Sequence, residues 1–238
     1  MRRLAVLVAL SILTVPVVVG LAAGTGGAVA AGSGSATGTI VTTGHTPLAG
    51  MCVNVVNASS NVTVGTSAAT TANGIWQLSG IPSSTAVIAY AFDCSGGNYV
   101  GVWWGNTPFQ SDAKQFTVGT GKTRAGINFN LKLGGAVTGK VTDAATKKPV
   151  ADILVIPFRL DQESAAAYAA CTATDGTYSL HGLPTTGVKV EFYANGCTST
   201  TYATQWYDNM PDYSSATVVH VGKNKTHANI NARLVEGG

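Results

Sequence analysis

Hydrophobic and polar residues alternate along much of the chain, most clearly in its second half. Apolar residues occupy every other position in the stretches 137–141, 188–192 and 230–234, with polar residues between them. Side chains that alternate in this way belong to β-strands with one buried face. Turn residues recur at intervals of roughly 8 to 12 residues, as in a two-sheet sandwich. The pattern therefore predicts an all-β chain. The Ala-rich stretch 162–170 is the one helix-like segment, and we interpret it as a loop leading into a strand.

Two stretches carry the same local pattern. Thr172 to Pro184 reads TATDGTYSLHGLP, and Thr70 to Pro82 reads TTANGIWQLSGIP. In each, Asp-Gly or Asn-Gly is followed by an alternating strand and then by Gly-apolar-Pro. Asn-Gly and Asp-Gly favour hairpin turns of the primed type, which match the twist of the flanking strands. We therefore expect a hairpin turn at Asn73-Gly74 and at Asp175-Gly176, with the strand ended by the Gly-apolar-Pro triplet.

The similarity extends over most of the chain as an internal repeat. Matching residues are separated by about 102 positions throughout, as in Thr37-Gly38 with Thr138-Gly139. Further matches join Cys94 to Cys197, Trp103-Trp104 to Trp206-Tyr207, and Ile127-Asn128 to Ile230-Asn231. The sequence thus predicts two tandem β-sandwiches with about seven strands each. Their expected ranges are 34–133 and 136–238, joined at Gly134-Gly135.

The amino-terminal residues predict export. Arg2 and Arg3 precede an apolar run from Leu4 to Ala23, and Ala28-Val29-Ala30 offers the small-residue site that a signal peptidase cuts after. The alternative is a retained anchor helix, because the run is about as long as a membrane span. Pro16 and the Gly-rich tail favour cleavage. We expect residues 1–30 to be a signal peptide and the mature chain to begin near Ala31, secreted and free of the membrane.

The amino-acid composition limits the classes of partner that this chain is expected to bind. Only 11% of the 238 residues are charged, and the formal net charge is +3. Charged residues make up roughly a quarter of an ordinary soluble domain, so this chain resembles extracellular β modules. No cluster of Lys and Arg interleaves with aromatic residues. Nucleic-acid binding therefore has little support.

Three runs in the second half of the chain resemble the carboxypeptidase regulatory-like domain. They read GKVTDAATKKPVADILV, TATDGTYSLHGLP and WYDNMPDYSSATVVHV. The resemblance covers nearly the whole mature chain, twice, and the first copy departs from it with Asn73, Trp76 and GNTPFQSDAK. It implies a transthyretin-like (prealbumin-like) Greek-key sandwich, similar to starch-binding and collagen-adhesin B-type modules and common in bacterial secreted proteins. It also implies a non-catalytic accessory or adhesive role.

Four cysteines in an exported chain indicate disulfides, and four allow three connectivities. Cys94 and Cys197 occupy the same loop in the two copies. Cys52 and Cys171 fall on strands expected to be neighbours, so we predict the bonds Cys52–Cys94 and Cys171–Cys197. Free, buried thiols are the alternative.

The candidate ligand-binding residues are aromatic and polar residues of one loop in each copy. Flat rings beside amides and carboxylates suit sugar rings, which stack on the aromatic face and offer hydroxyls. Core packing is the stronger alternative, because adjacent residues of a strand point to opposite faces. The candidates are Trp103 and Trp104 in the first copy, and Trp206, Tyr207, Asp208, Asn209, Asp212 and Tyr213 in the second.

Catalysis and cofactors find little support in the sequence. A glycosidase needs two facing acids, yet Asp175 is accounted for by its turn and the first copy keeps none of Asp175, Asp208 and Asp212. The four histidines show no metal-ligand spacing, so no metal or other cofactor is expected. Lys140, Glu191 and Asn231 lie on the first, middle and last strands, as in the internal Lys-Asn isopeptide bond of B-type adhesins. Their alternation away from the apolar residues argues against that buried chemistry.

The sequence therefore favours a secreted, non-enzymatic binding or structural module at the cell envelope or in the medium. A carbohydrate-binding accessory protein is the second interpretation, and an enzyme of polysaccharide (amylase-like) breakdown is the third. A polysaccharide or an envelope protein is the expected partner class. Nothing in the sequence specifies the ligand or the oligomeric state.

Overall fold

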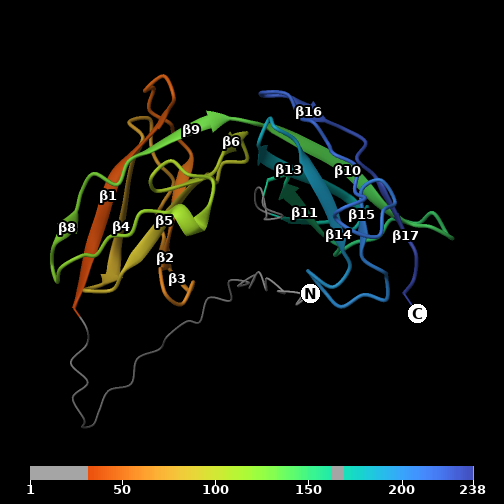
Figure 1. The fold of residues 1–238 in the computed structure, drawn as a ribbon, viewed down its shortest axis with the longest axis horizontal. Coiled ribbons are helices and arrows are strands. Elements are labelled where there is room, and N and C mark those ends of the chain that lie inside the picture. Colours follow the sequence, from red (N-terminus) through yellow and green to blue (C-terminus); the bar gives the residue numbers. More distant parts are fainter. Residues whose placement is uncertain (1–31, 162–168, 238) are drawn as a thin grey trace, which may run out of the picture. The chain divides into compact units, whose positions relative to one another are not determined.

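The computed structural model describes residues 32–161 and 169–237, and in this part of the chain the regular structure is strands with one short 3-10 helix, η1 (Gln110–Asp112). The predicted all-β fold is confirmed. The predicted signal peptide and most of the Ala-rich stretch 162–170 lie outside the described residues. Figure 1 shows the strands gathered into several twisted sheets.

The first half of the described chain contains two sheets that enclose one core. In the first sheet β1 lies between β4 and β9, with β6 beyond β9 and the short β8 also beside β1; in the second the order is β3-β2-β5-β7. The strands of the first sheet are β1 (Ser33–Thr42), β4 (Ile75–Pro82), β6 (Tyr99–Val100), β8 (Thr123–Arg124) and β9 (Phe129–Leu133), and those of the second are β2 (Met51–Asn57), β3 (Thr63–Thr66), β5 (Val87–Asp93) and β7 (Val102–Trp103).

The second half repeats this arrangement around a separate core. One sheet has the order β13-β10-β16 with β17 also paired to β10, and the other has the order β12-β11-β14-β15. The strands are β10 (Gly135–Asp143), β11 (Leu154–Arg159), β12 (Ala170–Cys171), β13 (Thr177–Leu183), β14 (Val188–Tyr193), β15 (Gln205–Trp206), β16 (Thr226–His227) and β17 (Ala232–Leu234).

Alternation along the strands produces the two cores. In β14, for example, Val188, Val190 and Phe192 are fully buried while Lys189 and Glu191 are half-buried on the other face. The largest buried side chains of the first core include Trp76, Phe129 and Ile40, and those of the second include Phe192, Leu180 and Leu234. Two cores agree with the predicted repeat. The division into domains at 34–133 and 136–238 remains our proposal, since the compact unit Ala31–Gly238 contains both.

The prediction of a primed hairpin turn at Asn73-Gly74 and Asp175-Gly176 is wrong. Gly74 and Gly176 have φ of 68° and 77°, but Asn73 and Asp175 do not have positive φ. The Gly74 N–H donates to the Thr71 carbonyl at 2.9 Å, which makes glycine the last residue of an ordinary turn. The reason lies in the topology: β3 pairs with β2 and β4 with β1, so this turn carries the chain between sheets and has no hairpin twist to match.

The strand number also differs from the prediction of about seven per copy. Several of the observed strands contain only two residues, among them β6, β7 and β8, because Gly, Pro and Asn interrupt the ladders there. Parallel pairing is a second feature that the alternation did not predict. β1 pairs in parallel with β9, and β10 pairs in parallel with β17, so a crossover closes each half.

A buried threonine in each half makes the same pair of hydrogen bonds to the segment that leads into β11 or β2. Thr172 Oγ1 donates to the Val150 carbonyl at 2.8 Å and accepts the Ile153 N–H at 3.0 Å. Thr70 Oγ1 does the same with the Leu48 carbonyl and the Met51 N–H, at 2.6 and 3.0 Å. Both hydroxyls are therefore satisfied in spite of burial.

Both predicted disulfides are confirmed. Cys52 and Cys94 have Cα atoms 5.7 Å apart, and Cys171 and Cys197 have Cα atoms 6.1 Å apart. Each bond joins strand β2 or β12 to the loop that follows β5 or β14. In the chain-entropy model, loops of this length contribute about 3 to 4 kcal/mol each to stability.

Candidate functional site

Trp206 is a packed residue of the second half. It lies on β15 opposite Glu191 of β14, and only 8% of its surface is exposed. Its ring centroid is 5.0 Å from that of Phe158 and 5.4 Å from that of Tyr213, the latter edge to face. These contacts favour the core-packing alternative for Trp206, and ligand binding by this residue remains a prediction.

Tyr213 is held in place at both ends. Its hydroxyl donates to the Arg159 carbonyl at 2.7 Å, and Lys189 Nζ lies 4.4 Å from its ring centroid. The same ammonium donates to the Tyr213 carbonyl at 2.6 Å and to that of Ser214 at 3.3 Å. The ring is half-buried, so the structure supports packing over stacking on a ligand.

Adjacent aromatic residues point to opposite faces, as alternation predicts. Trp104 packs against the first core, where its ring centroid is 5.6 Å from that of Phe116. Trp103 lies on the outer side, with its ring centroid 5.0 Å from that of Tyr90. In the second half Tyr207 packs against the core and Trp206 lies on the other face. Burial, with the Asp208 charge as a further cause, raises the pKa of Tyr207.

The polar candidate residues make hydrogen bonds within their own loop. Asp212 accepts hydrogen bonds from the Ser214 hydroxyl, the Ser215 N–H and the Ser215 hydroxyl at 2.7 to 2.9 Å, and these bonds lower its pKa to about 2. Asp208 Oδ1 accepts from Asn209 Nδ2 at 2.9 Å, and Asn209 Oδ1 accepts from Gln205 Nε2 at 2.8 Å. These carboxylates stabilise turns. Ligand binding by the loop remains a prediction.

The most perturbed carboxyl was not among the predicted site residues. Burial raises the pKa of Glu191 to about 7. Its cross-strand neighbours are Ile156 on β11 and Trp206 on β15, so an apolar side chain flanks it on each side. No nucleophile or second acid is paired with it in the register of these strands. The sequence signal was available, since Glu191 alternates with buried Val190 and Phe192, but its apolar cross-strand neighbours come from elsewhere in the chain.

The residues of the isopeptide alternative do not form a buried site. Lys140 and Asn231 are both exposed, and Asn231 Oδ1 accepts the backbone N–H of Lys140 at 2.8 Å. Asn128 Oδ1 accepts the Thr39 N–H at 2.9 Å in the first half. Both asparagines thus tie the first strand to the segment before the last one. Glu191 lies opposite Trp206, and the residue in the matching place of the first half, opposite Trp103, is Tyr90.

Histidines and acids do not gather into a metal site in the described ranges, where no group of three potential ligands is found. The four histidines are exposed on the surface. His181 Nε2 shares a 2.8 Å hydrogen bond with the Ser179 hydroxyl on the outer side of β13.

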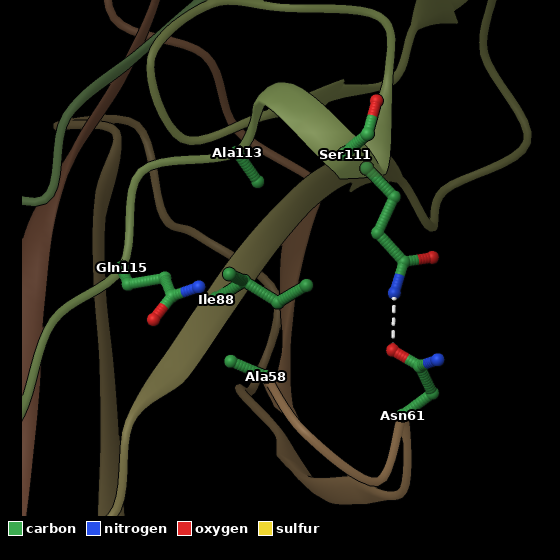
Figure 2. A pocket seen from close by; sticks show the side chains of 7 residues that line it. Ala58, Asn61, Ile88, Ser111, Ala113 and Gln115 are labelled. Atoms are coloured by element: carbon green, nitrogen blue, oxygen red, sulfur yellow. Dashed lines mark hydrogen bonds between the residues drawn. The ribbon is translucent and has the colours of Figure 1, made fainter.

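A shallow hollow in the first half is lined by none of the predicted site residues (Figure 2). It encloses about 310 Å³ between the β2–β3 turn, β5 and the segment around η1. Gln110 Nε2 donates to Asn61 Oδ1 at 2.8 Å across its rim. Its lining is uncharged, so it can offer hydrogen bonds but not acid–base catalysis. The lining residues are Ala58, Asn61, Ile88, Gln110, Ser111, Ala113 and Gln115.

No helix within the described ranges is long and apolar enough to cross a membrane. No protein-family model matches the sequence, and no curated protein matches it.

Several solved structures share a similar chain path. The TIE protein of Bacillus anthracis is 15% identical with a TM-score of 0.33, and the alignment covers 86% of this chain and 34% of that one. This chain therefore spans about a third of that protein's structure. The minor pilin GBS52 of Streptococcus agalactiae is 14% identical (TM-score 0.31, covering 86% and 96%). The shaft pilin SpaA of Lactobacillus rhamnosus GG is 10% identical (TM-score 0.32, covering 87% and 98%).

Proposed function

We propose that this protein is a secreted, non-catalytic structural module that acts at the cell envelope or in the medium. The observation that carries the proposal is the internal use of the groups that a binding or catalytic loop would need. Trp206 is covered by Phe158 and Tyr213, and the carboxylate of Asp212 is committed to Ser214 and Ser215. A loop built in this way stabilises a sandwich.

Two disulfides support an extracellular location, because such bonds persist in oxidising compartments. The small number of charged residues has the same implication. Expression of the full chain in a secreting host tests this part of the proposal. We expect protein from the medium to begin near Ala31 by amino-terminal sequencing. Recovery only in membranes, with Met1 retained, would contradict export.

Binding to polysaccharides separates this proposal from the carbohydrate-binding alternative. We expect no retention of residues 31–238 on insoluble glucans, chitin or peptidoglycan. Retention would overturn the structural interpretation. In that case, Asn61→Ala with Gln110→Ala tests the uncharged hollow, and Trp103→Ala tests the outer aromatic face. Trp206→Ala is less informative, because its loss of packing destabilises the fold.

An envelope protein or a further copy of the chain is the partner class that fits a structural module. Chemical crosslinking on intact cells, followed by identification of the attached proteins, tests this point. Crosslinks only to glycan would favour the second interpretation.

A further inference from the structure

The β4 strand is an unprotected edge of its sheet. It has eight residues and pairs only with β1 among the described strands. Edge strands expose unpaired N–H and C=O groups, and native proteins usually protect them with charges, prolines or bulges. The stretch 75–79 contains neither a charged residue nor a proline, and the bulge and Pro82 come only at its end.

The hydrogen-bond pattern shows which groups face outward. The Ile40 N–H donates to the Gly74 carbonyl, so the pairs Gly38–Trp76 and Ala36–Leu78 carry the ladder to β1. The backbone groups of Gln77 and Ser79 therefore point away from β1. The Ile75 N–H also points outward but is used by Asn73 Oδ1 at 3.2 Å.

The charge pattern around this edge differs sharply between the halves. Residues 32–92 contain no Asp, Glu, Lys or Arg, whereas the matching residues 134–194 contain eleven. The equivalent edge strand β13 itself also contains no Asp, Glu, Lys or Arg, but Lys140 of the adjacent β10 lies opposite its Thr177, and Asp175 comes two residues before it. The fold thus tolerates charge beside this edge, and the first half differs in having no charged residue anywhere around β4.

Symmetric self-association explains an uncharged edge. In a two-fold interface, each residue near the axis faces its own copy, so any charge there would meet a like charge. An antiparallel β4–β4 pair centred on Gln77 places Gln77 opposite its own copy and Ile75 opposite Ser79. Ile75 is 51% exposed in the single chain and would be covered by the added strand.

We propose that β4 is a self-association surface, through which two copies of this chain pair their first sheets edge to edge in antiparallel register. This inference goes beyond the proposed structural role and does not depend on the identity of any envelope partner. The pairing supplies backbone hydrogen bonds at Gln77 and Ser79 and continues the sheet from one copy into the next.

Sedimentation analysis of residues 31–238 over a range of concentrations is the first test. We expect a monomer–dimer equilibrium, and a Gln77→Lys variant whose dimer dissociation constant is raised at least tenfold, because two lysines would face each other. Thr63→Lys is the matched control on the edge strand β3, and we expect it to leave the equilibrium unchanged. A monomer at every concentration would overturn the proposal, as would an effect of Thr63→Lys equal to that of Gln77→Lys.

Cysteine crosslinking tests the register. In the pair centred on Gln77, a Gln77→Cys variant brings two sulfurs within reach, since directly opposed Cα atoms lie about 5.5 Å apart. Two Ser79→Cys residues would be separated by four positions, roughly 13 Å along the strands. We expect oxidation to give a covalent dimer with Gln77→Cys alone. Equal crosslinking by both variants, or by neither, contradicts the register.

Discussion

The hydroxyl of Tyr178 donates a 2.6 Å hydrogen bond to the carbonyl of Ile230, across the second core. In the first half Trp76 Nε1 donates to the carbonyl of Ile127 at 2.9 Å. Trp76 in the first half thus has the same function as Tyr178 in the second, because indole N–H and phenol O–H are both donors on large apolar rings. Burial raises the pKa of Tyr178 above its ordinary value, so the hydroxyl keeps its proton and remains a donor.

Tyr178→Phe should lower the free energy of unfolding by about 1 to 3 kcal/mol, since it leaves the Ile230 carbonyl without its donor while the ring is kept. Chemical denaturation measures this loss. Tyr193→Phe is the control, because Tyr193 is 40% exposed and should change little. A cost equal to that of the control would show that water satisfies the carbonyl.

Gly139→Ala should destabilise the second half by about 1 to 3 kcal/mol or more. A Cβ atom at Gly139 would collide with the Ile230 carbonyl oxygen, and one at Gly38 would collide with that of Ile127. Gly44→Ala is the control, since the nearest atom to its Cβ is Thr42 Oγ1 at 3.7 Å, and it should stay within about 0.5 kcal/mol. Thermal melts compare the two, and equal melting temperatures would contradict the prediction.

Tyr213→Ala should lower the melting temperature, with a cost of about 2 to 3 kcal/mol for the loss of a half-buried ring. Tyr213→Phe removes only the hydrogen bond to the Arg159 carbonyl and should cost about 0.5 to 1.5 kcal/mol. If both variants melt like the parent chain, the ring contributes nothing to the stability of the fold. That result would favour the interpretation of this loop as a ligand-binding surface.

Glu191→Gln should stabilise the protein above pH 7 and have little effect near pH 4. The folded pKa of about 7 lies above the ordinary value of 4.5, so the unfolded chain loses this proton first. Stability from the protonated group is complete below pH 4.5 and is lost as pH rises through 7. Lys189 on the same face is engaged by the carbonyls of Tyr213 and Ser214.

The gain at pH 8 should be on the order of 1 kcal/mol after allowance for solvent screening of a half-exposed group. Urea denaturation from pH 4 to 8 measures it, with Glu236→Gln as a surface control. A stabilisation that does not change with pH would show that the carboxylate charge is not its cause.

Alternation and the internal repeat were enough to predict the β class, the buried faces of the strands and both disulfides. These features depend on local patterns: alternation assigns Val188, Val190 and Phe192 to one face. The equivalent loops of Cys94 and Cys197, and the expected neighbouring strands of Cys52 and Cys171, predict the two bonds. The opposite directions of Trp103 and Trp104 follow from the same period of two.

Tertiary structure decided what the local pattern leaves open. The Asp175-Gly176 motif is compatible with a hairpin, yet its flanking strands join different sheets, so an ordinary turn forms. The loop that holds Trp206 and Tyr213 has the composition of a binding surface. However, Phe158 and Lys189 pack against its rings, and the Arg159 carbonyl accepts a hydrogen bond from the Tyr213 hydroxyl, all from distant strands. Likewise, the burial of Glu191 and the open edge of β4 depend on which strands become neighbours. That choice is made by contacts between residues far apart in the chain, which periodicity does not encode.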